Sequence, residues 1–285
     1  MRRADPDPRR PLGDKEKRIH FLYRSGRYEE VLTAVEASRK QMQEIPEPWN
    51  VRERILDTAH SAALALKRWQ EALALNQEIA QSKQDRRATA VELARARFND
   101  YWPLLKLERY AEARELLLEC RRAFEEPSDA WAIGKVLGAL ADLEDKLGHD
   151  AESIHYEQAA LRYHYDAGDP YGCRISHYKL AIYLSRGGSS RAALAHRLAA
   201  AIIRFQTRDG CVGGPWSALS REMAAFAPSP PPLPANFDEL CGAVEQVEGV
   251  RLRELFSRLP TENARTGDEA LEKVLELAAC VISPQ

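Results

Sequence analysis

A repeat of about 40 residues is the feature that most constrains how this chain can fold. Five segments align around a short turn and read SGRYEEV, LKRWQEA, LERYAEA, LGHDAES and GGSSRAA. Their central residues are Tyr28, Trp69, Tyr110, Asp150 and Ser190, separated by 41, 41, 40 and 40 positions. A period of this length indicates one supersecondary unit used five times, because each unit must bury its apolar face against the next.

Each copy has the pattern of two helices joined by a tight turn. Glycine stands before the turn residue in three copies, as Gly26, Gly148 and Gly188. Glycine reaches the left-handed conformation that ends a helix without a steric penalty. A small or β-branched residue then follows three positions after the turn residue and lets the two helices approach closely. These residues are Val31, Ala72, Ala113, Ser153 and Ala193.

This pattern resembles the tetratricopeptide repeat (TPR) family. The resemblance rests on the Gly-x-aromatic-x-x-small core of the turn and on first-helix packing pairs such as Leu140–Ala141 and Leu180–Ala181, and it covers residues 14–208. The family repeat has about 34 residues, so the helices here are expected to be about a turn longer. The resemblance implies an all-α fold, a right-handed α-solenoid of about five TPR-like hairpins with a C-terminal helical extension.

The hydrophobic period predicts ten helices within the repeats. Pro103 falls inside the fifth of them, where it either kinks the helix or marks a point at which the helix breaks or begins. The expected helices cover residues 14–25, 28–44, 50–66, 69–83, 86–107, 110–125, 128–147, 150–167, 170–186 and 189–208.

Further segments flank the repeats. Residues 1–13 are rich in Pro and Arg and are expected to be a flexible basic arm. Residues 209–226 are expected to form a loop and a capping helix, and residues 227–236 a stiff Pro-rich linker. Residues 237–285 are expected to hold three short helices, two over 237–259 and a third over 267–281. Because so small a module is marginal alone, we favour its docking on the last repeats over a separate effector domain.

Charge and composition exclude several classes of protein. Lys plus Arg is 41 and Asp plus Glu is 43, so a net charge of −2 excludes a globally basic nucleic-acid binder. No apolar run approaches the roughly 20 residues of a membrane span, and the N-terminus has no apolar signal-peptide region. The five cysteines are odd in number and widely spaced, which favours the reducing cytoplasm over a disulfide framework.

Motifs for catalysis and for cofactors do not stand out. The sequence has no phosphate-binding loop, no dinucleotide-binding fingerprint and no zinc-protease motif, so we expect neither an enzyme nor a bound cofactor or metal. Cys173 and His177 form an i,i+4 pair that could in principle supply a nucleophile. We interpret that pair as incidental.

The resemblance implies that the first helices of the hairpins line a concave groove that binds an extended or helical peptide. Cations recur just before the turn, beside aromatic residues, and would suit acidic and apolar side chains or a free C-terminal carboxylate. In the alternative interpretation, the aromatic residues pack between repeats and the cations are solvated. The candidate groove residues are Arg54, Arg95, Phe98, Asn99, Trp102, Lys106, Lys146, Tyr178 and Arg186.

The sequence therefore favours a non-enzymatic TPR scaffold or adaptor that binds a protein or peptide partner. One alternative is a TPR regulatory sensor, since bacterial peptide-pheromone receptors have a similar size and five such repeats. Those receptors carry an N-terminal DNA-binding domain, for which there is no room before residue 14, and the acidic balance of residues 237–282 disfavours DNA binding there. Another alternative is an accessory subunit of a bacterial signalling or protease system.

Overall fold

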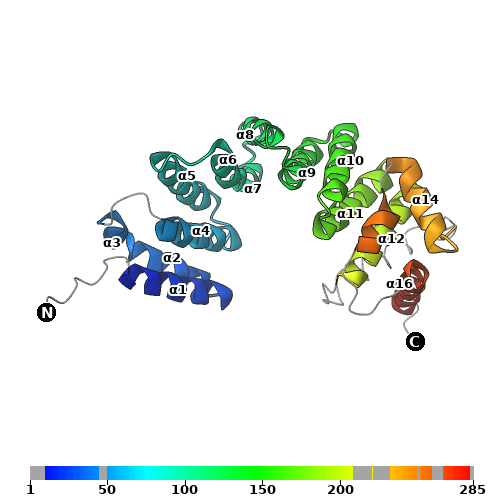
Figure 1. Cartoon of the computed structure of the whole chain (residues 1–285), viewed down its shortest axis with the longest axis horizontal. Coiled ribbons are helices and arrows are strands. Elements are labelled where there is room, and N and C mark those ends of the chain that lie inside the picture. The colour runs from blue at the N-terminus through cyan, green and yellow to red at the C-terminus, as the bar shows by residue number, and fades with distance from the viewer. Residues whose placement is uncertain are drawn as a thin grey trace. The chain divides into compact units, whose positions relative to one another are not determined.

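The described part of the chain is helical and contains no strand. The computed structural model describes residues 10–44, 50–207, 220, 232–248, 251–258 and 266–282. Helices that follow one another along the chain pack in adjacent pairs (Figure 1), which agrees with the predicted all-α fold. The contacts divide the chain into two units, residues 1–127 and 128–285.

The first unit contains three helical hairpins. Its core joins Val31 and Val35 of the first hairpin to Ile55, Leu56 and other buried residues of the second. The helices are α1 (Arg10–Arg24), α2 (Tyr28–Glu36), α3 (Arg39–Gln43), α4 (Asn50–Ala65), α5 (Trp69–Asp85), α6 (Ala90–Phe98), α7 (Tyr101–Lys106) and α8 (Tyr110–Glu125).

The second unit contains two further hairpins and the C-terminal helices. Leu180, Leu198 and Ile202 are fully buried in one continuous apolar core. The helices are α9 (Ala130–Leu147), α10 (Asp150–Asp166), α11 (Pro170–Arg186), α12 (Ser190–Gln206), α14 (Phe237–Glu248), α15 (Leu252–Arg258) and α16 (Gly267–Ile282).

All five hairpin turns share one backbone conformation. The second helix of every hairpin begins at the predicted turn residue. In each turn an amide closes a hydrogen bond five residues back, as Arg68 N does to Ala63 O at 2.9 Å, which is a Schellman helix end. The small residues that follow the turns are all fully buried, as predicted. The residue two before each second helix has a positive φ: Gly26 71°, Lys67 60°, Glu108 58°, Gly148 76° and Gly188 77°.

Two predicted helices are interrupted, so both of those predictions were too long. The helix expected over 28–44 divides into α2 and α3 at Ala37–Ser38, where Ser38 Oγ donates to Ala34 O at 2.7 Å. The helix expected over 86–107 begins at Ala90, after a capping box formed by Thr89 and Glu92.

That second helix also ends at Phe98, and α7 begins at Tyr101. Asn99 N and Asp100 N donate to carbonyls three residues back, so the helix tightens and stops there. Pro103 consequently lies in the first turn of α7, where a missing N–H costs no helical hydrogen bond. Of the two interpretations of Pro103, the structure has the helix break.

The N-terminal boundary also differs from the expectation. α1 begins at Arg10, so residues 10–13 are helical and do not belong to a flexible arm. Leu12 is fully buried in the core of the first unit, which gives this turn an apolar anchor. Residues 1–9 of the expected arm lie outside the described residues, as do 208–219 and 221–231 of the expected loop, capping helix and Pro-rich linker.

The C-terminal helices pack on the last hairpin. Phe237, Leu240 and Val244 of α14 share one core with Leu198 and Ile202 of α12, and α16 also packs on α12. An ion pair of 3.0 Å between Arg251 and Asp166 connects the segment before α15 to the end of α10. Of the two arrangements considered, α14, α15 and α16 have the docked one.

Candidate functional site

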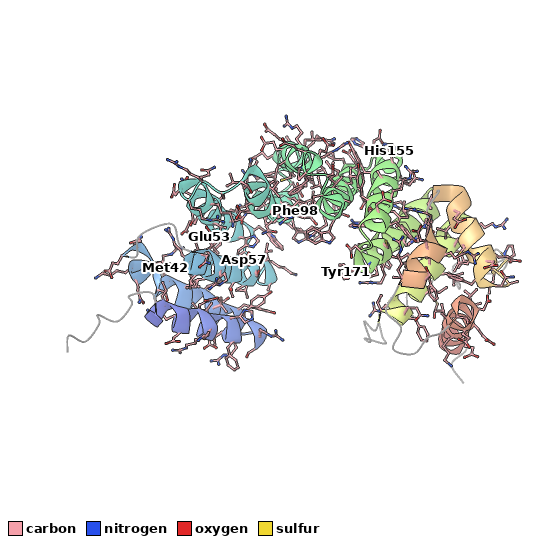
Figure 2. All side chains as sticks on the ribbon, viewed as in Figure 1. Met42, Glu53, Asp57, Phe98, His155 and Tyr171 are labelled. Carbon is pink, nitrogen blue, oxygen red and sulfur yellow. The ribbon has the colours of Figure 1, made fainter. Side chains whose placement is uncertain are left out.

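An aromatic cluster lies on α6 and α7, the broken first helix of the third hairpin. The ring centroids of Phe98 and Tyr101 are 5.0 Å apart, and those of Tyr101 and Trp102 are 6.2 Å apart with an edge-on orientation. Phe98 lies where α6 ends (Figure 2). Trp102 is 37% exposed, and Lys106 Nζ lies 4.3 Å from the centroid of its ring. This cluster offers a partner an exposed indole face with a cation held over it.

The other three candidates in the first unit differ in their surroundings. Arg54 forms a bidentate pair with Glu16 of α1, at 2.7 and 3.0 Å, and this pairing raises the pKa of the guanidinium. Its charge is thus compensated within the unit. Arg95 is exposed on α6, and Asn99 is the half-buried residue that ends that helix.

The second unit contains the remaining three candidates. The guanidinium of the buried Arg197 lies 4.3 Å from the ring of Tyr178, which is 39% exposed. Arg186 pairs with Asp145 and lies 3.7 Å from Asp150, so two carboxylates already neutralise it. Lys146 is exposed in the last turn of α9.

The structure adds two aromatic residues that the list of candidates lacked. Trp131 is 45% exposed at the start of α9 with Lys135 Nζ 4.3 Å from its ring, and Tyr171 is 63% exposed at the start of α11 with Arg174 5.0 Å from its ring. In Figure 2, Tyr171 near the start of α11 and His155 near the start of α10 lie toward opposite ends of this pair of helices. A sequence signal existed, because positions 131 and 171 are 40 residues apart, one repeat period, and both are aromatic.

The exposed large apolar residues concentrate on the first helices of the hairpins. Seven such residues occur among those that the structure describes, and only Leu118 and Leu233 lie elsewhere. The five on first helices are Phe21 of α1, Trp102 of α7, Trp131 of α9, and Tyr171 and Tyr178 of α11. We call this set, with the cations stacked on four of its members, the first-helix aromatic set.

The interior of the second unit holds a layer of buried polar groups. Lys179 Nζ lies 2.7 Å from Asp142 and 3.3 Å from the fully buried Glu157. Tyr165 Oη lies 2.7 Å from His177 Nε2, and His177 Nδ1 lies 2.7 Å from His196 Nδ1. Desolvation lowers the pKa of His177 well below its usual value, and the nearby His196 acts in the same direction, so the imidazole stays neutral. These contacts connect α9, α10, α11 and α12, and we interpret them as holding the helices together.

The Cys173–His177 pair lacks the surroundings of a nucleophile. Both side chains are fully buried, and burial raises the pKa of the Cys173 thiol far above its usual value. A nucleophilic cysteine needs the opposite, an accessible thiol with a lowered pKa. Across the described ranges, no group of three or more His, Cys, Asp or Glu side chains is arranged to hold a metal ion. None of the described helices combines the length and apolar character needed to cross a membrane.

This chain is similar in structure, but not closely in sequence, to a known protein. No protein-family model matches this sequence, and no curated protein matches it. Among solved structures, the chain is similar to the crystal structure of BtubC (BKLC) from P. vanneervenii, with a TM-score of 0.52 and 13% sequence identity. The similarity covers 99% of this chain and 94% of BtubC. At that level of identity, it shows a shared helical fold and carries no information about the site.

Proposed function

We propose that this chain is a non-enzymatic scaffold of TPR-like hairpins that binds a protein or peptide partner on the face formed by its first helices. In this proposal the hairpins form a right-handed α-solenoid, and the first-helix aromatic set lines its concave groove. We also propose a cytoplasmic location, because the odd number and wide spacing of the cysteines favour a reducing compartment over a disulfide framework.

One observation carries the proposal, namely the placement of the exposed aromatic residues. Exposed Trp and Tyr side chains are costly in water and are the residues that dominate protein interfaces, together with Arg. Five of the seven exposed large apolar residues in the described part of the chain lie on first helices. These helices are α1, α7, α9 and α11, which belong to four of the five hairpins. This concentration on the first helices supports a binding face there.

The stacked cations indicate the chemistry of the partner. Lys106, Lys135 and Arg174 each lie within about 5 Å of an exposed aromatic ring. A partner with carboxylates beside apolar side chains would bury the rings and pair with the cations at once. We therefore propose an acidic, partly apolar segment, or one with a free C-terminal carboxylate.

A comparison of matched variants tests this function. The double variant Trp131→Ala/Tyr171→Ala removes two members of the aromatic set, and Leu118→Ala removes an exposed apolar residue from the second helix α8. Proteins that co-purify with each form from the native host would be quantified by mass spectrometry. We expect at least a tenfold loss of a specific partner with the double variant, no loss with Leu118→Ala, and unchanged helical circular dichroism. Equal retention by all forms contradicts the proposal.

A second measurement addresses the charge of the partner. Synthetic peptides from the retained partner would be titrated against the wild-type chain and against Lys135→Glu. We expect the binding peptide to be acidic and to bind Lys135→Glu at least fivefold more weakly. A basic peptide with unchanged affinity for Lys135→Glu contradicts the proposed chemistry.

A further inference from the structure

A groove on the second-helix side of the first unit is separate from the aromatic set. It has a volume of about 710 Å³ and lies between α5 and α8, the second helices of two successive hairpins. Figure 1 shows α6 and α7 between these two helices. The break between α6 and α7 forms the floor, where Arg97, Asp100 and Leu104 line the groove.

Two rows of polar side chains form the walls of this groove. One row consists of amides, which both donate and accept hydrogen bonds, and the other consists of carboxylates, which only accept them. The spacing of three, four or seven residues places each row along one side of its helix. The rows are Gln70, Gln77, Gln81 and Gln84 on α5, and Glu112, Glu115 and Glu119 on α8.

The charge of the lining is negative and only partly compensated. Arg97 pairs with Glu119, and Arg109 pairs with Glu112, each at 2.5 Å. The lining thus holds four carboxylates, those of Asp100, Glu112, Glu115 and Glu119, against two guanidiniums, which also act on Asp100, so its formal charge is 2 − 4 = −2. A cation entering the groove would therefore meet a net negative lining, with Asp100 on the floor and Glu115 on the α8 wall.

One carboxylate oxygen of Asp100 lacks a hydrogen bond within the described part of the chain. Its Oδ1 atom is buried and has no hydrogen-bond partner among the described residues. Burial raises the pKa of Asp100 to about 6, although Asn76, Arg97 and Arg109 act in the other direction. A buried carboxylate oxygen without a partner is unfavourable, so Asp100 places a costly acidic group at the floor of the groove.

We propose that the groove between α5 and α8 binds an extended basic segment of a partner protein, with an arginine or lysine side chain reaching Asp100 and Glu115. The glutamine row supplies hydrogen bonds to the backbone of an extended peptide, and the acidic row selects basic side chains. The phosphates of a nucleic acid would be repelled by the same lining. The walls of this groove lie on second helices and its floor at the break between α6 and α7, and no member of the first-helix aromatic set lines it, so the inference does not depend on the function proposed for that set.

A labelled peptide tests the proposal with the full chain. The probe is a fluorescein-labelled nonapeptide of alternating arginine and glycine, compared with a glutamate–glycine peptide of the same length by fluorescence anisotropy. We expect the arginine peptide to bind at least tenfold more tightly, and its affinity to fall with added salt. No binding of the arginine peptide at millimolar chain concentration overturns the proposal.

Two double variants separate a local site from a general charge effect. Asp100→Asn/Glu115→Gln removes the two carboxylates, while Glu44→Gln/Glu126→Gln makes the same change in net charge at exposed positions outside the groove. We expect at least a fivefold weaker affinity for the first variant and unchanged affinity for the second. Equal effects of the two variants overturn the proposal.

Two further measurements locate the site and define its ligand. Hydrogen exchange should show that the peptide protects α5 and α8, and Trp131→Ala/Tyr171→Ala should bind it as the wild type does. Spermidine serves as a small-cation competitor. If spermidine displaces the peptide at equal concentration, the groove binds small cations and the peptide proposal is wrong.

Discussion

Lys179 of α11 donates a hydrogen bond from Nζ to the carbonyl oxygen of Gly138 on α9, at 3.0 Å across 41 residues of sequence. A Cβ on Gly138 would lie 3.8 Å from that nitrogen, in ordinary van der Waals contact. The same ammonium faces Asp142 and the fully buried Glu157. Burial lowers the pKa of Lys179, but these two carboxylates outweigh it and hold the pKa above its usual value. One lysine thus connects α9, α10 and α11 of the second unit.

The first prediction concerns this lysine. Lys179→Met should destabilise the second unit by about 3 to 5 kcal/mol, because it leaves the buried Glu157 without its cation. The double variant Lys179→Met/Glu157→Met should regain most of that loss, since no buried charge then remains at position 157. Urea unfolding followed by circular dichroism measures both. A double variant less stable than the single one would contradict this account.

The second prediction concerns the turns that lack glycine. Lys67 and Glu108 occupy the left-handed position that glycine occupies in the other three hairpins. Lys67→Gly and Glu108→Gly should each stabilise the first unit by about 0.5 to 1 kcal/mol, because glycine avoids the left-handed penalty of about 1 kcal/mol or more. Thermal unfolding measures the change. Gly148→Ala is the matched reverse control, with no atom within 4 Å of the added Cβ, and it should destabilise by a similar amount.

The third prediction concerns the pH dependence of Asp100. Its pKa of about 6 lies above the usual 3.8, so ionising Asp100 costs more in the folded protein than in the unfolded chain. The contribution of Asp100 to stability therefore increases as the pH falls from about 6 toward 4. Asp100→Asn should stabilise the first unit at pH 7.5 by at most about 3 kcal/mol, since one pKa unit corresponds to about 1.4 kcal/mol. The gain should shrink at pH 4.5, which urea unfolding at the two pH values would show.

The fourth prediction concerns the buried His177. The folded protein keeps this imidazole neutral, whereas the unfolded chain takes up a proton near pH 6.5. Stability is therefore complete above about pH 6.5 and falls as the pH drops below it, by about 1.4 kcal/mol per pH unit for one histidine. In His177→Gln, hydrogen-exchange protection of α11 should fall less between pH 7.5 and 5.5 than in the wild type. His155→Gln, at an exposed position of α10, should behave as the wild type does.

Local chemistry made the hairpins predictable. The start of each second helix, the glycine turns and the buried small residues all depend on a few neighbouring positions and on a period repeated five times. The interruptions at Ser38 and at Asn99–Asp100 escaped prediction, because the hydrophobic period continues through both of them. Only the backbone hydrogen bonds of the folded chain show where these helices tighten and stop.

The repeat alignment was sufficient to predict that the first helices carry aromatic residues and cations. It could not predict which side chains these residues contact. Tyr178 stacks on Arg197 from the next helix, and Arg186 is neutralised by Asp145 from the preceding hairpin. Contacts between residues on different helices depend on how the hairpins pack, and a one-dimensional pattern carries no such information. The repeat alone therefore determined the helical hairpins and their turns, while packing between helices determined which charges are paired within the protein and which side chains remain exposed.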